Sequence, residues 1–173
     1  MPTFLALLRA VNVGGTGKLP MAELKSMCEK AGFTAVRTYI ASGNVVFNAS
    51  QSALQVKAAL EKSLLAYAGK PVLVMVRSAS EMAAVLSANP FPAAPPNRTV
   101  VIFMDQAPAA DTIDKLSGQH GEQVVLGQRE ISVHYGEGMA NSKLKVPGAE
   151  CGTGRNVNTV AKLAAMAAVV TMA

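Results

Sequence analysis

The order of apolar patterns in the first 77 residues leaves few folds open to this chain. Runs typical of strands alternate with stretches at helical spacing, at residues 3–9, 20–31, 36–47, about 51–68 and 71–77. The third run is broken by Ser42-Gly43-Asn44, a turn sequence that makes it a hairpin. The predicted order is therefore β-α-β-β-α-β. This is the split βαβ or ferredoxin-like arrangement, in which two helices cover one face of a four-stranded antiparallel sheet.

The last strand of this half is apolar on both faces. Val72 to Val76 show no polar alternation before Arg77, although the fourth strand of a ferredoxin-like sheet lies at its edge. A solvent-facing edge would leave such a run exposed. We therefore predict that this strand is paired or covered on both sides by the second half of the chain.

The remainder of the chain repeats much of this order. A capping box at Ser78 and Glu81 predicts a short helix to about Ala88, and the four prolines of residues 89–97 predict an irregular segment. A strand, a helix, a hairpin and a last helix follow, at residues 98–104, 109–116, 123–135 and about 156–170. This β-α-β-β-α order lacks the closing strand of the first half.

The predicted fold class is α+β, with two ferredoxin-like (split βαβ) halves packed into one compact chain, antiparallel sheets and helices on one face. Residues 1–77 form the first half (β-α-β-β-α-β), and residues 78–173 form the second (α-β-α-β-β-α). The matching order indicates a structural duplication that sequence identity no longer shows.

Composition excludes several classes of protein. The hydrophobic share of 50% is ample for a packed core. The apolar run at residues 163–173 is shorter than the roughly 20 residues that cross a bilayer. The N-terminal run is interrupted by Arg9 and lacks a signal-peptide cleavage site. Cys28 and Cys151 have no partner at metal-ligand spacing, so we expect reduced thiols in a cytoplasmic protein.

The loop from Asn12 to Lys18 joins the first strand to the first helix, as a phosphate-binding P-loop does. It does not fit the motif GxxxxGK[ST], because Asn12 stands in place of the first glycine and Leu19 in place of the hydroxyl that binds Mg²⁺. Gly14 and Gly15 can still bring backbone N–H groups to an anion, with Lys18 as a point charge. The alternative is a tight turn whose glycines only supply positive φ.

A second candidate is the segment TGRNVNTVAKL at the start of the last helix. Arg155, Thr159 and Lys162 recur at spacings of four and three on one face, beside the free N–H groups of the helix start. A phosphate or a carboxylate suits this set. The alternative is a solvated polar face, with Thr153 or Asn156 capping the helix.

The hairpin turn from Tyr39 to Asn44 is the third candidate. Ser42 and Asn44 can hydrogen-bond their own backbone, so both are also explained as turn formers. Arg37 and Tyr39 share a strand face that can stack a base. The paired aromatics of an RNA-binding ferredoxin-like module are nevertheless missing from GNVVFN.

Side chains for nucleophilic or metal catalysis are scarce. His120 and His134, the two histidines, have no acid or thiol at a recognised spacing. Cys28 falls on the apolar face of its helix, and Cys151, close to the last helix, is the candidate reactive thiol. We therefore expect no metal site and no cofactor, and whether the protein is an enzyme stays open.

Four segments, LALLRAVNVGGTGKLPMAEL, GFTAVRTYIASGNVVF, NPF and TGRNVNTVAKL, resemble the bacterial family catalogued as domain of unknown function 1697. The resemblance covers about Phe4 to Leu163. Where family members often have a glycine before the asparagine-containing loop, this chain has Ala10. The resemblance implies a whole-chain α+β architecture and no established activity. It also implies that the motif positions form one site: Arg9, Asn12, Gly14, Gly15, Tyr39, Ser42, Gly43, Asn44, Arg155, Asn156 and Thr159.

These positions are polar and cationic with little carboxylate, which favours recognition of an anion over acid–base hydrolysis. The leading hypothesis is a binding protein or a transferase-like enzyme for a phosphate-bearing small molecule or nucleotide, with Lys18 and Lys162 added to the site. The rival is a nucleic-acid-binding module, favoured by the formal net charge of +5 and the ferredoxin-like order. A structural or interaction protein is the third alternative.

The hypothesis makes a testable prediction. The glycine loop and the start of the last helix should meet in one pocket, with an anion between Lys18 and Arg155. Replacing Arg155 with alanine should weaken ligand binding. It should leave folding nearly unchanged, because a surface cation contributes about 0.5 kcal/mol or less to stability.

Overall fold

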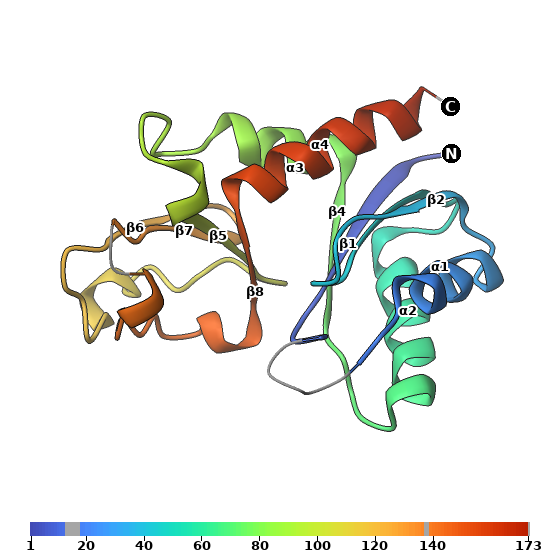
Figure 1. Ribbon diagram of the computed structural model, residues 1–173, viewed down its shortest axis with the longest axis horizontal. Helices are drawn as coiled ribbons and strands as arrows, with labels where there is room; N and C mark the ends of the chain where they lie inside the picture. Colours follow the sequence, from blue (N-terminus) through green and yellow to red (C-terminus); the bar gives the residue numbers. More distant parts are fainter. Residues whose placement is uncertain (13–17, 137–138, 173) are drawn as a thin grey trace. The chain divides into compact units, whose positions relative to one another are not determined.

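A computed structural model of the protein describes residues 1–12, 18–136 and 139–172 (Figure 1). By their internal contacts the residues divide into two compact units. The first unit comprises Met1–Ala84 together with Lys162–Ala173, and the second comprises Val85–Ala161. The sequence predicts a boundary between residues 77 and 78 and places the whole last helix in the second half. The two units differ from this prediction in the position of the boundary and in the end of the last helix, which belongs to the first unit.

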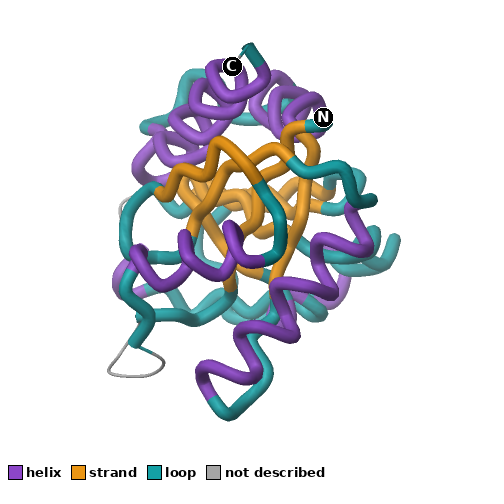
Figure 2. Tube along the Cα trace, turned by 90° about the vertical axis from the view of Figure 1, so that its right-hand side faces the viewer, coloured by secondary structure: helices purple, strands orange, loops and turns teal. Residues whose placement is uncertain are grey.

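The first unit contains a four-stranded antiparallel sheet in the order β2-β3-β1-β4. Its strands are β1 (Thr3–Leu8), β2 (Thr34–Thr38), β3 (Asn44–Asn48) and β4 (Val74–Ser78). Connecting them are the helices α1 (Met21–Lys30) and α2 (Ala53–Ala68). Figure 2 shows these helices in front of the strands. The predicted β-α-β-β-α-β order is confirmed.

Local sequence explains where the helices begin and end. Ser52 and Gln55 form a capping box at α2: the Gln55 N–H donates to the Ser52 hydroxyl (3.2 Å), and the Ser52 N–H donates to the Gln55 side chain (2.9 Å). Gly69 ends α2 in the left-handed conformation, with a φ of 72°. Pro20 precedes α1, where its missing N–H has no intrahelical partner to lose.

One face of this sheet forms a core with the two helices. Leu24 of α1 and Leu60 of α2 are fully buried in the same cluster as the alternate residues of β1. The Phe33 and Phe47 rings stack with their centroids 4.4 Å apart. Cys28 is fully buried in this cluster, which confirms it as a core residue, and this burial raises the pKa of its thiol to about 12.

The opposite face of the sheet is buried as well. At most 1% of the surface is exposed in four of its side chains: Leu5, Leu7, Met75 and Arg77. The C-terminal part of α4 (Val157–Thr171) belongs to this unit, and the Thr171 hydroxyl donates to the Thr3 hydroxyl (2.9 Å). The strand β4 pairs with β1 at the edge of the sheet and is buried on both faces. Its coverage by the second half stays a prediction.

The second unit repeats this sheet in the order β6-β7-β5-β8. Its strands are β5 (Thr99–Phe103), β6 (Gln123–Leu126), β7 (Glu130–His134) and β8 (Thr153–Asn156). Every neighbouring pair is antiparallel, as in the first unit. Helix α3 (Ala79–Ser87) follows β4, and α4 follows β8 directly. The α+β class with two antiparallel sheets is therefore confirmed.

Two expectations for the second half are wrong. The second half was expected to lack a closing strand, but β8 is present and pairs with β5. Its sequence, TGRN, contains no apolar side chain, so it shows no alternation that would predict a strand. The helix expected at residues 109–116 is reduced to the 3₁₀ turn η2 (Ile113–Lys115). There the Thr112 hydroxyl donates to the Ala109 carbonyl (2.7 Å), a local bond that competes with helix, and the segment is too short to offset helix nucleation.

The duplication extends to a buried arginine in the fourth strand of each sheet. Arg77 on β4 and Arg155 on β8 each lie opposite the third residue of the neighbouring strand. Each guanidinium donates to the carbonyl of the preceding residue, Arg77 to Val76 (3.0 Å) and Arg155 to Gly154 (2.9 Å). Equivalent positions of the two sheets therefore hold the same side chain with the same backbone bond.

The hairpin between β2 and β3 turns through Gly43, where the backbone requires glycine. The φ of Gly43 is 89°, and a Cβ there would lie 2.7 Å from the Val11 Cγ2 and 2.9 Å from the Leu8 Cβ. The Leu8 N–H donates to the Gly43 carbonyl (2.9 Å). The turn therefore lies against the end of β1 and the residues that follow it.

Gly43→Ala is expected to lower the free energy of unfolding by about 2 kcal/mol or more, because strain at positive φ adds to a clash with two buried side chains. Gly32→Ala is the matched control, because its φ is 90° but nothing lies within 4 Å of the added Cβ. Strain alone should cost the control about 1 kcal/mol. Urea unfolding measures both variants, and equal losses would show that the close approach to β1 has no effect.

Candidate functional site

A cavity of about 220 Å³ lies in the first unit, at the end of β1. Its lining comes from the residues that follow β1, those that precede α1, and the segment from the end of α2 toward β4. The lining residues are Arg9, Ala10, Val11, Lys18, Leu19, Leu64, Tyr67, Ala68, Lys70, Pro71, Val72 and Leu73.

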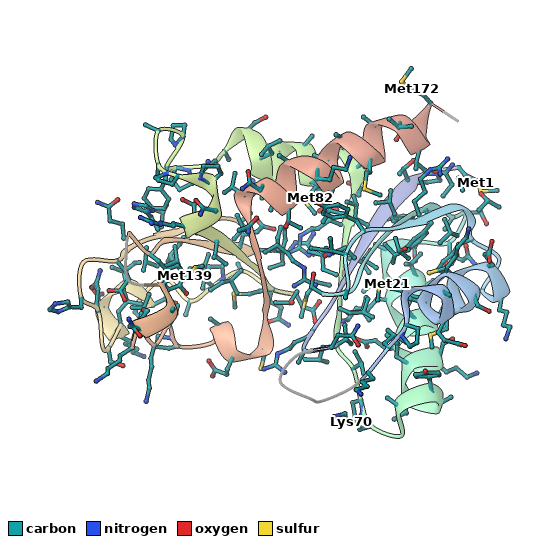
Figure 3. All side chains as sticks on the ribbon, viewed as in Figure 1. Met1, Met21, Lys70, Met82, Met139 and Met172 are labelled. Atoms are coloured by element: carbon teal, nitrogen blue, oxygen red, sulfur yellow. The ribbon has the colours of Figure 1, made fainter. Side chains whose placement is uncertain are left out.

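The fold brings three cations to this cavity from three different connections. Arg9 directly follows β1, and its backbone N–H donates to the Leu73 carbonyl (2.9 Å), which extends the pairing of β1 with β4. Lys70 follows Gly69, the residue that ends α2, and lies in the turn toward β4 (Figure 3). Lys18 precedes α1. The antiparallel return of β4 therefore places the segment after α2 beside the residue after β1.

The charge of the cavity is positive. Among the described residues that line it, three are Lys or Arg and none is Asp or Glu. Lys18 and Lys70 are exposed, whereas Arg9 is half-buried. Like charges around one cavity repel, and an anion between them removes that repulsion. Apart from Tyr67, the rest of the lining is apolar.

Asn12 fastens the loop beside the cavity. Its side-chain amide donates to the carbonyls of Leu19 (2.8 Å) and Ala41 (2.7 Å). Its side-chain oxygen accepts from the Leu19 N–H (2.8 Å). One side chain thus joins both ends of the glycine loop to the hairpin turn. Because both N–H groups of its amide already bond backbone carbonyls, Asn12 holds Leu19 and the hairpin turn in place.

Backbone strain is found in the same place. The φ angles of Ala10, Asn12 and Ile40 are 56°, 55° and 51°, in the left-handed region that non-glycine residues rarely adopt. Ile40 is β-branched, so its conformation is the least favourable of the three. Ala10 occupies the position where the family that the sequence resembles often has glycine, which adopts this φ freely. Strain of about 1–3 kcal/mol per residue persists where the surroundings hold it, and it often marks functional sites.

The residues of the hairpin turn do not line the cavity. The Asn44 side-chain amide donates to the Tyr39 carbonyl (2.9 Å) and to the Ser42 hydroxyl (3.0 Å). These bonds fit the alternative that Ser42 and Asn44 are turn formers. Gly14 and Gly15, the other candidates from the glycine loop, lie outside the described residues.

Of the candidate site residues, Arg155 has the position and burial that differ most from those predicted. It lies in β8 rather than on the last helix, and it is only 7% exposed. Its guanidinium donates to the Thr153 hydroxyl (2.6 Å). Burial lowers its pKa to about 10, so it is charged at neutral pH. The expectation of a surface cation is therefore wrong, and the small effect on folding that was inferred from it no longer follows.

The other candidates around the start of α4 do not share one exposed face. The Thr159 N–H donates to the Asn156 side-chain oxygen (2.9 Å), so Asn156 caps α4, whereas Thr153, the other capping residue expected, lies at the start of β8. Thr159 is buried, whereas Lys162 is exposed. Lys18 belongs to the first unit and Arg155 to the second, so an anion site shared by the two stays a prediction.

Of the described lining residues, the sequence suggests only Arg9 and Lys18 as candidates, and it misses two polar ones, Tyr67 and Lys70. The predicted topology contains a signal that could have identified these two residues. In a ferredoxin-like unit the fourth strand returns beside the first, so the residues just before it must lie near Arg9. A cation that directly follows the helix-ending Gly69 is therefore a candidate on topological grounds.

Other kinds of site find little support. Within residues 1–12, 18–136 and 139–172, no group of three His, Cys, Asp or Glu side chains is placed to hold a metal ion. No helix in the described part of the chain is long and apolar enough to cross a membrane. Cys151 is exposed in the 3₁₀ turn η4 (Ala149–Cys151). Since β8 separates it from α4, it does not sit at the helix start that made it a candidate reactive thiol.

Known proteins share this architecture. A family model described as "Protein of unknown function (DUF1697)" matches residues 1–131. The structure of conserved bacterial protein SP0830 from Streptococcus pneumoniae is similar, with a TM-score of 0.80 and 26% sequence identity, over 96% of this chain and 98% of that chain. No curated protein sequence matches. The similarity therefore extends over both units and brings no activity.

Arg155→Ala is expected to lower the free energy of unfolding by about 2 kcal/mol or more, because it removes charge-assisted hydrogen bonds and leaves space at a buried position. Arg37→Ala, at an exposed position of β2, is the control and should change it by about 0.5 kcal/mol or less. Chemical denaturation followed by circular dichroism measures both. Equal stability of the two variants would contradict a structural role for Arg155.

Proposed function

The chain belongs to the family described as "Protein of unknown function (DUF1697)", and we propose that it is a binding protein, or a transferase-like enzyme, for a phosphate-bearing small molecule or nucleotide. The site is the cavity lined by Arg9, Lys18 and Lys70. The observation that carries the proposal is this set of three cations around a described lining that contains no carboxylate. We place the protein in the cytoplasm, where its two free cysteines stay reduced.

The charges of the cavity suit an anion with more than one negative charge. Arg9 offers a planar guanidinium that can donate two parallel bonds to one phosphate, whereas Lys18 and Lys70 act as point charges. A single carboxylate would balance only one of them. A phosphate group carries about two charges near neutral pH, and a diphosphate carries more. Phosphate chemistry therefore fits this cavity better than a monocarboxylic acid.

The apolar part of the lining limits the rest of the ligand. Val11, Leu19 and Leu64 form an apolar wall, and Tyr67 offers a ring that is 47% exposed. The volume of about 220 Å³ is below the several hundred Å³ typical of sites for drug-sized ligands. The cavity therefore suits the phosphate-bearing part of a ligand, with the remainder outside it.

The rival function is nucleic-acid binding. It is favoured by the formal net charge of +5 and by the ferredoxin-like sheets. Polynucleotide binding depends steeply on salt, because counterions leave the phosphate backbone when a protein binds. A salt series therefore separates a polynucleotide ligand from a small phosphate that a cavity holds. A structural or interaction protein, the third alternative, would bind neither.

Lys18→Ala and Lys70→Ala should each weaken the binding of pyrophosphate or adenosine diphosphate by about tenfold, which is the loss of one charge-assisted contact. Both lysines are exposed, so the free energy of unfolding should change by about 0.5 kcal/mol or less. Lys25→Ala, at an exposed position of α1 outside the cavity, is the matched control. Isothermal titration calorimetry of the full chain measures these affinities.

The outcomes separate the alternatives. Binding that both cavity variants weaken and the control leaves unchanged supports the proposal. Binding of single-stranded polynucleotide that collapses at physiological salt, without binding of the small phosphates, supports the rival. If none of these probes binds or raises the melting temperature, the proposed function is wrong and a structural role is favoured.

A further inference from the structure

The two units differ most in the connections between their equivalent strands. In the first unit, α1 and α2 fill these connections and pack against the sheet. In the second unit, the described parts of the same connections hold only 3₁₀ turns: η2 before β6, then η3 (Met139–Asn141) and η4 before β8. Figure 3 labels Met139 in the first of the latter two. Loops held by a rigid sheet are common places for binding residues.

The two loops of the second unit are fastened to each other. The Ser117 N–H donates to the Lys145 carbonyl (3.2 Å), and the Lys145 N–H donates to the Ser117 carbonyl (2.8 Å). Gly118 has a φ of 69°, and a Cβ there would lie 2.0 Å from the Lys143 carbonyl oxygen. Only glycine permits this approach. The relative position of the loops is therefore built into the backbone.

A buried carboxylate joins the same loops again. Glu122 is 5% exposed, and its side chain accepts from the Ser142 hydroxyl and from the His120 backbone N–H. The Gln119 side-chain amide donates to the Glu122 carbonyl (2.6 Å), and the Leu144 N–H donates to the Ser142 hydroxyl (3.2 Å). These bonds, first the one from Ser142 and then the one from His120, lower the pKa of Glu122. Glu122 is therefore a fixed, ionised acceptor at neutral pH.

A cavity of about 480 Å³ lies beside this carboxylate, between the two loops. Its described lining is polar throughout, glycine apart, and none of these residues is Ala, Val, Leu, Ile or Met. Lys143 balances the charge of Glu122, so the lining does not have the excess of cations found in the first unit. Tyr135 contributes a half-buried ring. Desolvation and the charge of Glu122 raise the pKa of Tyr135, so its hydroxyl remains a donor at neutral pH.

We infer that this cavity binds a neutral polyhydroxylated ligand, either a free sugar or the sugar part of a nucleoside. Such a ligand presents hydroxyl groups that each donate and accept, so it needs both kinds of partner around it. Glu122 supplies acceptors, Lys143 supplies donors and the amide of Asn141 supplies both. The ring of Tyr135 offers an apolar surface with a polar end, which suits the C–H face of a sugar ring. The lining offers no such match to an aliphatic or a strongly anionic ligand.

Titration of the nitrogen-15-labelled full chain tests this inference by following its backbone amide signals. The probes are glucose, galactose, N-acetylglucosamine and ribose as free sugars, adenosine as a neutral nucleoside, and inorganic phosphate as an anion. Saturable shifts at residues 118–122, 135 and 141–143 are expected with at least one sugar or with adenosine. Shifts with free sugars assign the site to saccharides, and shifts with adenosine alone assign it to nucleosides.

Two variants probe the cavity without touching the bonds that fasten its loops. Asn141→Ala removes an exposed amide, and Tyr135→Phe removes a hydroxyl but keeps the ring. Each should weaken binding of the responding probe by roughly tenfold, the loss of one hydrogen bond, with an unchanged melting temperature. Lys25→Ala, at an exposed position of α1 outside both cavities, should bind that probe as tightly as the unchanged protein. This inference does not rest on the proposed function.

Three results would overturn the inference. The first is the absence of saturable shifts at these residues with every sugar and with adenosine. The second is a response there to inorganic phosphate alone, which would make the cavity an anion site. The third is unchanged affinity in both Asn141→Ala and Tyr135→Phe, which would place the ligand elsewhere.

Discussion

The burial of β1 is the constraint on which the first unit depends. All six residues from Thr3 to Leu8 are buried, with β3 and β4 paired to the two edges of the strand. Side-chain alternation normally selects the register of a strand, but a strand that is buried on both faces gains little from it. Here a polar side-chain pair at one end helps to select it, because the Thr3 hydroxyl donates to the Asn48 side chain (2.6 Å). At the other end the Arg9 N–H donates to the Leu73 carbonyl and continues the pairing with the segment before β4. This register of β1 also places Arg9 at the cavity.

The two units show what a duplicated sheet retains and what it is free to change. The strand order, the antiparallel pairing and the arginine of the fourth strand, Arg77 or Arg155, are the same in both. The connections differ, because helices pack on the sheet in the first unit and fastened loops replace them in the second. Backbone pairing depends little on side-chain identity, whereas a helical layer needs an apolar stripe along its whole length. The connections are thus where chemistry can diverge, and they hold both cavities.

The first unit was predictable because its local signals agree with its tertiary structure. The apolar spacing of α2, the cap at Ser52 and the stop at Gly69 all indicate one helix, and the structure contains it. The strand β8 was not predictable, since its pairing with β5 is long-range and TGRN carries no apolar alternation. The burial of Arg155 follows from that strand, so residue type alone predicted the opposite. In the cavity, Arg9 and Lys18 belong to recognisable motifs, whereas the place of Lys70 depends on where β4 returns.

The helix α4 begins in the second unit and ends in the first, so the chain leaves the first unit after residue 84 and rejoins it at residue 162. The hydrogen bond between Thr171 and Thr3 joins positions that are 168 residues apart. During synthesis on the ribosome, β1 is therefore made early, but Thr3 cannot bond Thr171 until the whole second unit has been made. The second unit can complete its own sheet during that delay, since all four of its strands precede residue 162. The order of synthesis thus makes the unit that starts first the last to be completed.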